Sequence, residues 1–138
     1  MSNIVFDETF KIVGIDVDGK IYDKVSRIDA KGEDGITDMV LDINSEIYPV
    51  FVNKLYRMVL SRTLDLGGSD NHPEGKTISL ADKFEYIMHG LLYKVAEESS
   101  KVAVYISFGG LQLKLCSAPL NMSKFKLDQR LFLLLRKI

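Results

Sequence analysis

The side chains best suited to nucleophilic or metal chemistry are few in this sequence and widely separated. The chain contains one cysteine, Cys116, and two histidines, His72 and His89. A cysteine nucleophile needs a histidine base within hydrogen-bond reach, and this spacing offers such a pair only through chance proximity in the fold. We therefore expect Cys116 to be a buried structural thiol. His89 lies in an apolar segment and is expected to be a packed or interface residue rather than a metal ligand.

One short motif begins like a calcium-binding loop. Asp16-Val17-Asp18-Gly19 supplies the first carboxylates, but the glycine comes two positions early. Arg27 occupies the position at which such a loop needs a bidentate glutamate. These residues therefore predict a turn between two strands. The sequence also contains no GxSxG elbow and no recognisable carboxylate pair, so we expect no active site, no cofactor and no resident metal.

The glycine pair Gly109-Gly110 lies within the stretch VYISFGGLQLKL. A phosphate-binding loop would require a helix N-terminus directly after the glycines. Here an alternating strand-like segment, QLKL, follows instead. Glycine tolerates unusual backbone angles because it has no Cβ, so the pair predicts a bulge or a sharp bend in a sheet.

A group of cations around one aromatic residue is typical of a single-strand nucleic-acid groove. The group comprises Lys20, Tyr22, Lys24, Arg27 and Lys31. Four aspartates interrupt the same segment, and the whole chain carries a net charge of −1. Because binding of this kind depends on net phosphate neutralisation, a solvated strand edge is the favoured interpretation. A dedicated nucleic-acid binder usually carries a clear basic excess, which this chain lacks.

The elements that must position these residues are strands, because apolar residues alternate with period two along most of the chain. Turn-forming residues separate the segments. The expected strands are Ile4–Val13, Tyr22–Ala30, Met39–Asn44, Ile47–Val52, Leu55–Leu64, Phe84–Val95, Val102–Phe108, Leu111–Cys116 and Leu131–Lys137. About seven to nine short strands predict an antiparallel sandwich or barrel. We expect a single domain over residues 1–138, in a soluble intracellular protein without a signal peptide. A short turn with Ser79 as its cap is expected at Ser79–Lys83.

The segment at about residues 67–77 has no periodicity and is rich in Gly, Asp, Asn and Pro. It predicts one mobile surface loop. The loop either contacts a partner or is a tolerated insertion between strands. The second interpretation is favoured because long surface insertions cost little closure entropy.

Two expected strands carry large apolar side chains on both faces. They are Phe84–Val95 and Leu131–Lys137. A small barrel has one interior, so one face of each strand should point outward. Either a loop of the same chain or another protein must cover those side chains, and contiguous apolar patches favour a partner.

Six sequence blocks together resemble a known family in order and spacing. They are MSNIVFDETF, YDKVSRIDA, LDINSEIYPV, SLADKFEYIMHGLLYKV, AVYISFGGLQLKL and LFLLLRK. The chain closely resembles the eighth common subunit of eukaryotic nuclear RNA polymerases I, II and III over its whole length. The resemblance implies an all-β fold, a small antiparallel barrel with OB-like (oligonucleotide/oligosaccharide-binding) topology. It also implies a structural, non-catalytic subunit that docks on the largest polymerase subunit, supports assembly, and resides in the nucleus, including the nucleolus.

The resemblance further implies weak, non-specific affinity for single-stranded DNA in the segment Asp16–Met39, where the basic group lies. It also marks signature positions at which alternation fails or glycines allow close approach. We expect the docking interface among Tyr86, Met88, Gly90, Tyr93, Ser107, Phe108, Gly109, Gly110 and Leu111. The alternative function is a free-standing, weak single-stranded nucleic-acid-binding module.

Overall fold

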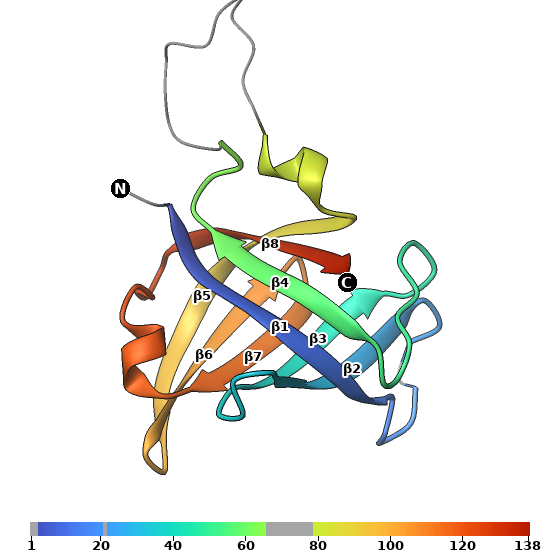
Figure 1. Cartoon of the computed structure of the whole chain (residues 1–138), viewed down its shortest axis with the longest axis horizontal. Helices are drawn as coiled ribbons and strands as arrows, with labels where there is room; N and C mark the ends of the chain where they lie inside the picture. Colours follow the sequence, from blue (N-terminus) through green and yellow to red (C-terminus); the bar gives the residue numbers. More distant parts are fainter. Residues whose placement is uncertain (1–2, 21, 66–78) are drawn as a thin grey trace, which may run out of the picture.

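The computed structural model describes residues 3–20, 22–65 and 79–138 (Figure 1). Hydrogen-bonded strands form one closed barrel with neighbour order β1-β2-β3-β7-β6-β5-β8-β4. Every neighbouring pair is antiparallel. The strands are β1 (Ile4–Ile15), β2 (Val25–Gly32), β3 (Asp38–Asn44), β4 (Leu55–Ser61), β5 (Tyr86–Glu98), β6 (Lys101–Phe108), β7 (Leu111–Ser117) and β8 (Arg130–Lys137). The predicted all-β class and small antiparallel barrel are confirmed. The predicted mobile loop at 67–77 lies outside the described residues.

One predicted strand, Ile47–Val52, is wrong. The chain leaves β3 at Asn44 and makes a series of turns before β4 begins at Leu55. The side-chain oxygen of Asn44 accepts hydrogen bonds from the backbone N–H groups of Glu46 (3.1 Å) and Ile47 (3.2 Å). An asparagine that bonds its own following backbone offers an alternative to the sheet ladder, so the strand stops there.

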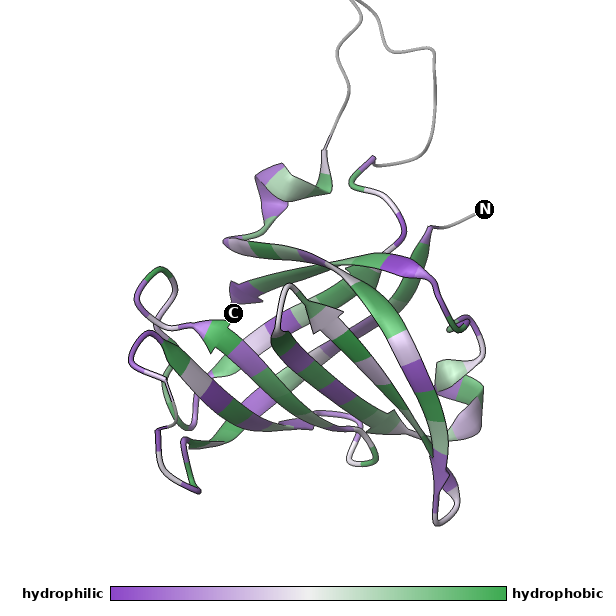
Figure 2. Ribbon diagram, turned by 180° about the vertical axis from the view of Figure 1, so that it is seen from behind, coloured by the Kyte–Doolittle hydropathy of each residue, from purple (hydrophilic) through white to green (hydrophobic). Residues whose placement is uncertain are grey.

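Hydrophobic and hydrophilic residues alternate along the strands (Figure 2), and the apolar ones fill the barrel interior. Phe10, Leu41, Leu92 and Leu113 are fully buried members of this core. Each strand presents the intervening residues to the outside, as a period of two requires. At one end of the barrel the short 3₁₀ helix η3 (Pro119–Met122) brings Met122 into the same core.

A second apolar cluster lies on the outer face of β4 and β8. Val59 and Leu134 are fully buried there, beneath Leu80 of the 3₁₀ helix η2 (Leu80–Lys83). Phe84 and Ile87 pack against them. The same chain therefore covers much of the outward apolar face of β5 and β8. For these residues the alternative of cover by the same chain holds, because η2 lies over them. Tyr93 and Val95, farther along β5, stay 46% exposed, so cover of that part by a partner remains a prediction.

Helix η2 begins as the sequence predicts. The hydroxyl group of Ser79 accepts a hydrogen bond from the N–H of Ala81 (3.1 Å). The carbonyl oxygen of Ser79 accepts from the N–H of Asp82 (3.3 Å). Among the described residues, no helix has the length and apolar character needed to cross a membrane.

The glycine pair forms the hairpin turn between β6 and β7. Phe108 pairs directly with Leu111, which leaves Gly109 and Gly110 as a two-residue loop. Their φ angles are 61° and 103°, and positive φ at both central residues is what a type I′ hairpin turn requires. The prediction of a sharp bend is confirmed, whereas the alternative of a bulge is wrong. The positions are glycine because of this backbone geometry.

Candidate docking surface and charged face

The residues of the predicted docking interface divide between the inside and the outside of the barrel. Tyr86 and Phe108 belong to the buried core, and Gly90 is buried between β5 and β6. Met88 and Leu111 are partly buried and pack against the same core. The folded chain does not present Tyr86, Gly90 or Phe108 to a partner, so these three residues have structural roles.

Tyr86 links β5 to the end of β3. Its hydroxyl oxygen accepts a hydrogen bond from the N–H of Asn44 (2.9 Å), and its ring stacks on Tyr48 with centroids 5.2 Å apart. Burial raises the pKa of Tyr86 above its ordinary value. The hydroxyl group thus satisfies a backbone donor at the point where the β3 ladder ends.

Tyr93 lies on the outer face of β5, next to the inward-facing Leu92, at a point where the strand is irregular. The register between β5 and β6 shifts between Leu92 and Lys94, and Tyr93 is the additional residue. Its side chain is 46% exposed. Its hydroxyl group donates a 2.6 Å hydrogen bond to Oε1 of Gln112, and its ring lies 6.3 Å from that of Tyr105. A bulge accommodates one extra residue in this way without breaking the sheet.

We call the outward-facing set around Tyr93 the outer β5–β7 surface, in which Tyr93, Gly109 and Gly110 are exposed and the other members are half-buried. It comprises Tyr93, Tyr105, Ser107, Gly109, Gly110 and Gln112. Ser107 Oγ accepts a hydrogen bond from the N–H of Gly110 (3.3 Å), which ties the turn to β6. Sequence reasoning missed Tyr105 and Gln112. The signal was available, because both alternate with buried residues of β6 and β7 and must therefore point outward.

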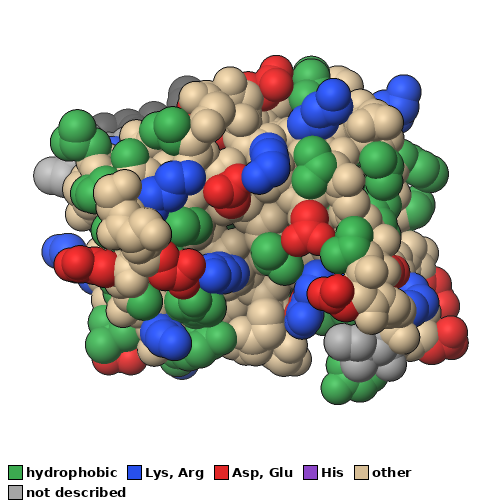
Figure 3. All heavy atoms as spheres, turned by 90° about the horizontal axis from the view of Figure 1, so that it is seen from below, with side chains coloured by type: hydrophobic (Ala, Val, Ile, Leu, Met, Phe, Trp, Pro, Cys, Tyr) green, Lys and Arg blue, Asp and Glu red, His purple; other side chains and the backbone are tan. Residues whose placement is uncertain are grey.

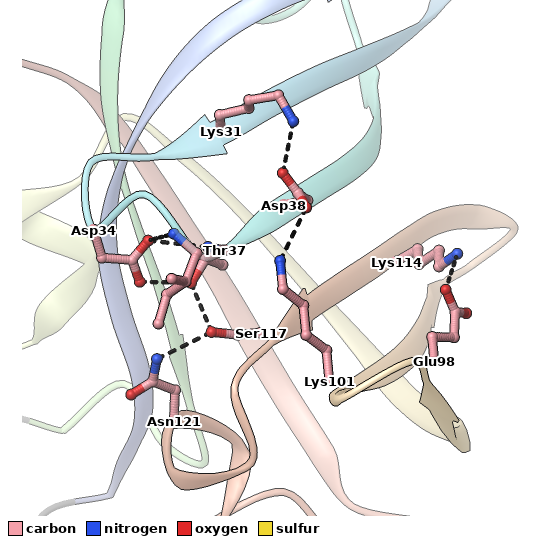
Figure 4. Close-up of polar contacts among 10 residues, drawn as sticks. Lys31, Asp34, Thr37, Asp38, Glu98, Lys101, Lys114, Ser117 and Asn121 are labelled. Carbon is pink, nitrogen blue, oxygen red and sulfur yellow. Dashed lines mark hydrogen bonds and ion pairs between the residues drawn. The ribbon is translucent and has the colours of Figure 1, made fainter.

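Charged groups surround Tyr105 on this surface. The ammonium groups of Lys94 and Lys114 lie 4.9 Å and 5.7 Å from its ring centroid. Lys114 also pairs with Glu98 at 3.0 Å, as Figure 4 shows. The Tyr105 hydroxyl group donates to Glu98 (2.9 Å). Hydrogen bonds from Lys114 and Tyr105 lower the pKa of Glu98 below its ordinary value.

The predicted basic group is largely neutralised by neighbouring acids. Arg27 makes a bidentate pair with Asp42 (2.7 and 3.1 Å). Lys31 pairs with Asp38 at 2.8 Å, and Lys24 with Glu46 at 3.8 Å. Lys20 donates to the hydroxyl oxygen of Ser26 (3.3 Å), and Tyr22 is 68% exposed. The hydrogen bond to Asp42 raises the pKa of Arg27 further.

The space-filling view also indicates that acidic neighbours neutralise the basic side chains. Figure 3 shows Lys and Arg side chains interspersed with Asp and Glu, without a continuous basic area on that face. Asp38 lies between two lysines, Lys31 and Lys101, as Figure 4 shows. Alternating charges of this kind attract a polyanion weakly.

A pocket of about 250 Å³ lies beside Arg27, between the β1–β2 connection and the outer faces of β2 and β3. Its lining includes four carboxylates and one guanidinium group. The residues are Asp16, Val17, Asp18, Gly19, Tyr22, Val25, Arg27, Asp29, Val40 and Asp42. An acidic lining repels phosphate, so this pocket does not fit a backbone-binding groove.

In the described part of the chain, no other group suggests catalysis. Cys116 is partly buried, and burial raises the pKa of its thiol, which disfavours the reactive thiolate. His89 stacks on Phe132 with centroids 4.3 Å apart. Within residues 3–20, 22–65 and 79–138, no three His, Cys, Asp or Glu side chains are arranged to hold a metal ion.

Comparison with known proteins identifies the family. The sequence model of the family RNA polymerase Rpb8 matches residues 7–137. The chain is 43% identical to "DNA-directed RNA polymerases II, IV and V subunit 8B" of Arabidopsis thaliana, covering 99% of each chain. It is 42% identical to "DNA-directed RNA polymerases I, II, and III subunit rpabc3" of Dictyostelium discoideum, again with 99% of each covered.

The similarity extends to a more distant relative. "DNA-directed RNA polymerases I, II, and III subunit RPABC3" of Saccharomyces cerevisiae is 33% identical, over 99% of this chain and 100% of the relative. Matches of this length leave no part of the barrel unaccounted for. The chain belongs to the RNA polymerase Rpb8 family.

Proposed function

We propose that this chain is a non-catalytic structural subunit common to DNA-directed RNA polymerases I, II and III. The observation that carries the proposal is the family match over residues 7–137, together with relatives that are named as shared polymerase subunits. The chain is a component of a larger enzyme and not an enzyme on its own. Its closed antiparallel barrel suits a part that contributes shape and contact area to an assembly.

We infer that the chain docks on the largest polymerase subunit through the outer β5–β7 surface. Tyr93 is an exposed aromatic residue held in one orientation by its hydrogen bond to Gln112 (2.6 Å). Such pre-ordered aromatics are frequent anchors of protein interfaces. Gly109 and Gly110 have open space where a side chain would lie, so a partner backbone can approach the turn closely. Membership of polymerases I, II and III implies a nuclear location that includes the nucleolus.

Affinity purification tests both the proposed subunit function and the proposed docking surface. A tagged chain expressed in its native cells should co-purify with the other polymerase subunits. The variant Tyr93→Glu should reduce the recovered largest subunit by about tenfold or more, the loss typical of an interface anchor. Tyr22→Glu is the matched control, since Tyr22 is also exposed but lies on the β1–β2 connection. A folded Tyr93→Glu protein that is incorporated as well as Tyr22→Glu would refute the docking surface alone. A wild-type chain that recovers no polymerase would refute the function.

The alternative of a free-standing nucleic-acid-binding module gains no support from the ion pairs of Arg27, Lys31 and Lys24. Fluorescence anisotropy with a labelled oligothymidine separates the two functions. A dedicated binder should bind tightly at low salt and lose affinity steeply as salt rises. We expect weak binding at low salt and no measurable binding at physiological salt.

A further inference from the structure

Part of strand β1 has a neighbour on one side only. Residues Ile4–Lys11 pair with β4, whereas pairing with β2 covers only Phe10–Ile15. The stretch Ile4–Thr9 therefore extends past the end of β2. A barrel normally removes sheet edges by closing, so this stretch is an exception within the described fold.

The hydrogen bonds of Ile12 show which groups point to the open side. Its N–H and carbonyl groups bond to Lys54 (3.1 Å) and Asn53 (2.8 Å) on the β4 side. Successive residues of an antiparallel strand alternate in direction, so Thr9 and Asp7 point away from β4.

Thr9 is satisfied on the open side. Its carbonyl oxygen accepts from the N–H of Glu33 (2.8 Å), and its own N–H donates to Oε1 of Glu8 (2.9 Å). For the N–H and carbonyl groups of Asp7, no backbone partner on this side lies in the part of the chain that the structure describes. Unpaired strand groups of this kind are the template on which a further strand can form.

A groove of about 560 Å³ runs along this edge. The residues from Ile4 to Glu8 form one wall, and helix η3 with the loop after β2 forms the other. The opposite wall carries two exposed apolar side chains, Leu120 (89% exposed) and Ile36 (42% exposed). Apolar side chains beside an open strand edge can receive alternate side chains of an added strand.

Hydrogen bonds hold the two parts of the second wall, the loop after β2 and helix η3, together. Asp34 accepts hydrogen bonds from the N–H of Ile36 (3.0 Å) and the hydroxyl group of Thr37 (2.6 Å). The Thr37 hydroxyl group also bonds to that of Ser117 (2.7 Å), to which Asn121 of η3 donates (3.0 Å). Figure 4 shows this chain of contacts from the loop after β2 to η3. The loop after β2 and η3 therefore form one continuous wall that faces the β1 edge.

The charge at the groove selects the partner. The carboxylate of Asp7 pairs with Arg57 (2.7 Å). Lys124 also lines the groove, but among the described residues no cation lies within ion-pair distance of Glu8 or Asp34, so carboxylates outnumber the free cation there. Burial, together with the nearby charge of Asp34, raises the pKa of Glu8. Two uncompensated carboxylates beside an open edge favour an incoming lysine or arginine side chain.

We propose that the Val5–Asp7 edge of β1 binds an extended, basic segment of a partner protein as an added β-strand, with a cationic side chain placed beside Glu8 and Asp34. This site lies at the Ser117 end of β7, whereas the outer β5–β7 surface includes the glycine turn at the opposite end. It is therefore a second contact, independent of docking through Tyr93. Backbone hydrogen bonds supply the affinity of such a strand, and alternate side chains supply the specificity.

A pair of variants at position 7 separates strand addition from simple charge attraction. Asp7→Pro and Asp7→Ala both remove the carboxylate that pairs with Arg57, but only proline removes the N–H at the open edge. The β4 ladder does not use that N–H, so both variants should fold. Equal thermal unfolding by circular dichroism is the check.

The experiment selects peptides from a phage-displayed library of random dodecapeptides on the immobilised full chain. Selected peptides should alternate apolar and basic residues. They should bind wild type and Asp7→Ala with similar affinity and bind Asp7→Pro about tenfold more weakly, the effect of one lost backbone hydrogen bond. Glu8→Gln, which keeps an oxygen acceptor for Thr9, should weaken binding severalfold.

Three results would overturn the proposal: failure to select any peptide, equal binding to Asp7→Pro and Asp7→Ala, or concentration-dependent self-association through this edge in place of peptide binding. If Asp7→Pro does not fold, amide hydrogen exchange of wild type decides the matter. The Asp7 amide should exchange about tenfold more slowly with a selected peptide bound, and an unchanged rate would refute strand addition.

Discussion

Gly90 of β5 lies directly against the carbonyl group of Ser107 in β6. A Cβ at position 90 would fall 2.6 Å from Cδ1 of Phe108 and 2.9 Å from the carbonyl carbon of Ser107, and closer still to the carbonyl oxygen. The obstructing atoms are largely backbone, so they cannot rotate away. The glycine at this position is therefore required by the packing of two adjacent strands.

Gly90→Ala should lower the free energy of unfolding by about 3 kcal/mol, because overpacking against backbone forces the strands apart. Urea unfolding followed by circular dichroism measures the change. Gly19→Ala is the comparison variant, since a Cβ there meets no atom within 4 Å and only the positive φ of 92° is strained. A loss at position 90 no larger than that at position 19 would contradict the close approach.

A second prediction concerns the hairpin turn at Gly109 and Gly110. Gly109→Asn should leave stability within about 0.5 kcal/mol of wild type, because asparagine tolerates positive φ in type I′ turns. Gly109→Val should cost about 1–2 kcal/mol, since a β-branched residue is strained at a φ of 61°. Differential scanning calorimetry of the two variants tests the turn type. Equal losses for Asn and Val would show that the position is glycine for another reason.

Tyr86 should behave as a structural residue. Tyr86→Phe removes the acceptor for the N–H of Asn44 while keeping the ring stacked on Tyr48. We expect a loss of about 1–2 kcal/mol in the free energy of unfolding, measured in urea, because a backbone donor is left without a partner. Recovery of polymerase subunits with the tagged variant should match wild type at a temperature where the variant is folded. A folded variant that loses polymerase would instead place Tyr86 in the interface.

The ion pairs of Asp38 should make the free energy of unfolding depend on pH. The hydrogen bond from Lys31 and the charge of Lys101 lower the pKa of Asp38 below its ordinary value of 3.8. A carboxylate whose pKa is lowered by folding stabilises the native state above its unfolded pKa, and the contribution disappears as pH falls through the folded pKa.

Asp38→Asn should therefore cost up to about 1 kcal/mol at pH 7 and almost nothing near pH 2, a modest figure because Asp38 is half exposed. Urea midpoints of wild type and variant at both pH values measure the difference. High salt should shrink the gap at pH 7. A gap that grows towards low pH would mean that Asp38 does not act as a paired carboxylate.

Period-two alternation was enough to predict nearly every strand of the barrel. Val104, Ile106 and Phe108 alternate with outward residues and lie inside as the pattern requires. The failure at Ile47–Val52 has a local cause that alternation cannot reveal. The side chain of Asn44 competes for backbone donors, and Pro49 lacks one, so an apolar and aromatic segment forms turns instead.

The candidate site was harder to predict, because a signature motif does not say which face of a strand it marks. Tyr86 and Tyr93 lie an odd number of positions apart in β5, so alternation places them on opposite faces. Because both faces of this strand carry large apolar side chains, the sequence does not say which face is the interior. The outer cluster under Leu80 was missed for a related reason, because cover by η2 depends on tertiary packing.

The position of β8 between β5 and β4 has a consequence for synthesis of the protein. Until residues 130–137 leave the ribosome, β4 and β5 each lack a neighbour, and the cylinder cannot close. Between the synthesis of β5 and that of β8, the nascent chain thus exposes two unpaired strand edges. Closure waits for β8, so a chaperone or an early encounter with the assembling enzyme would act on an open, curved sheet rather than on a finished barrel.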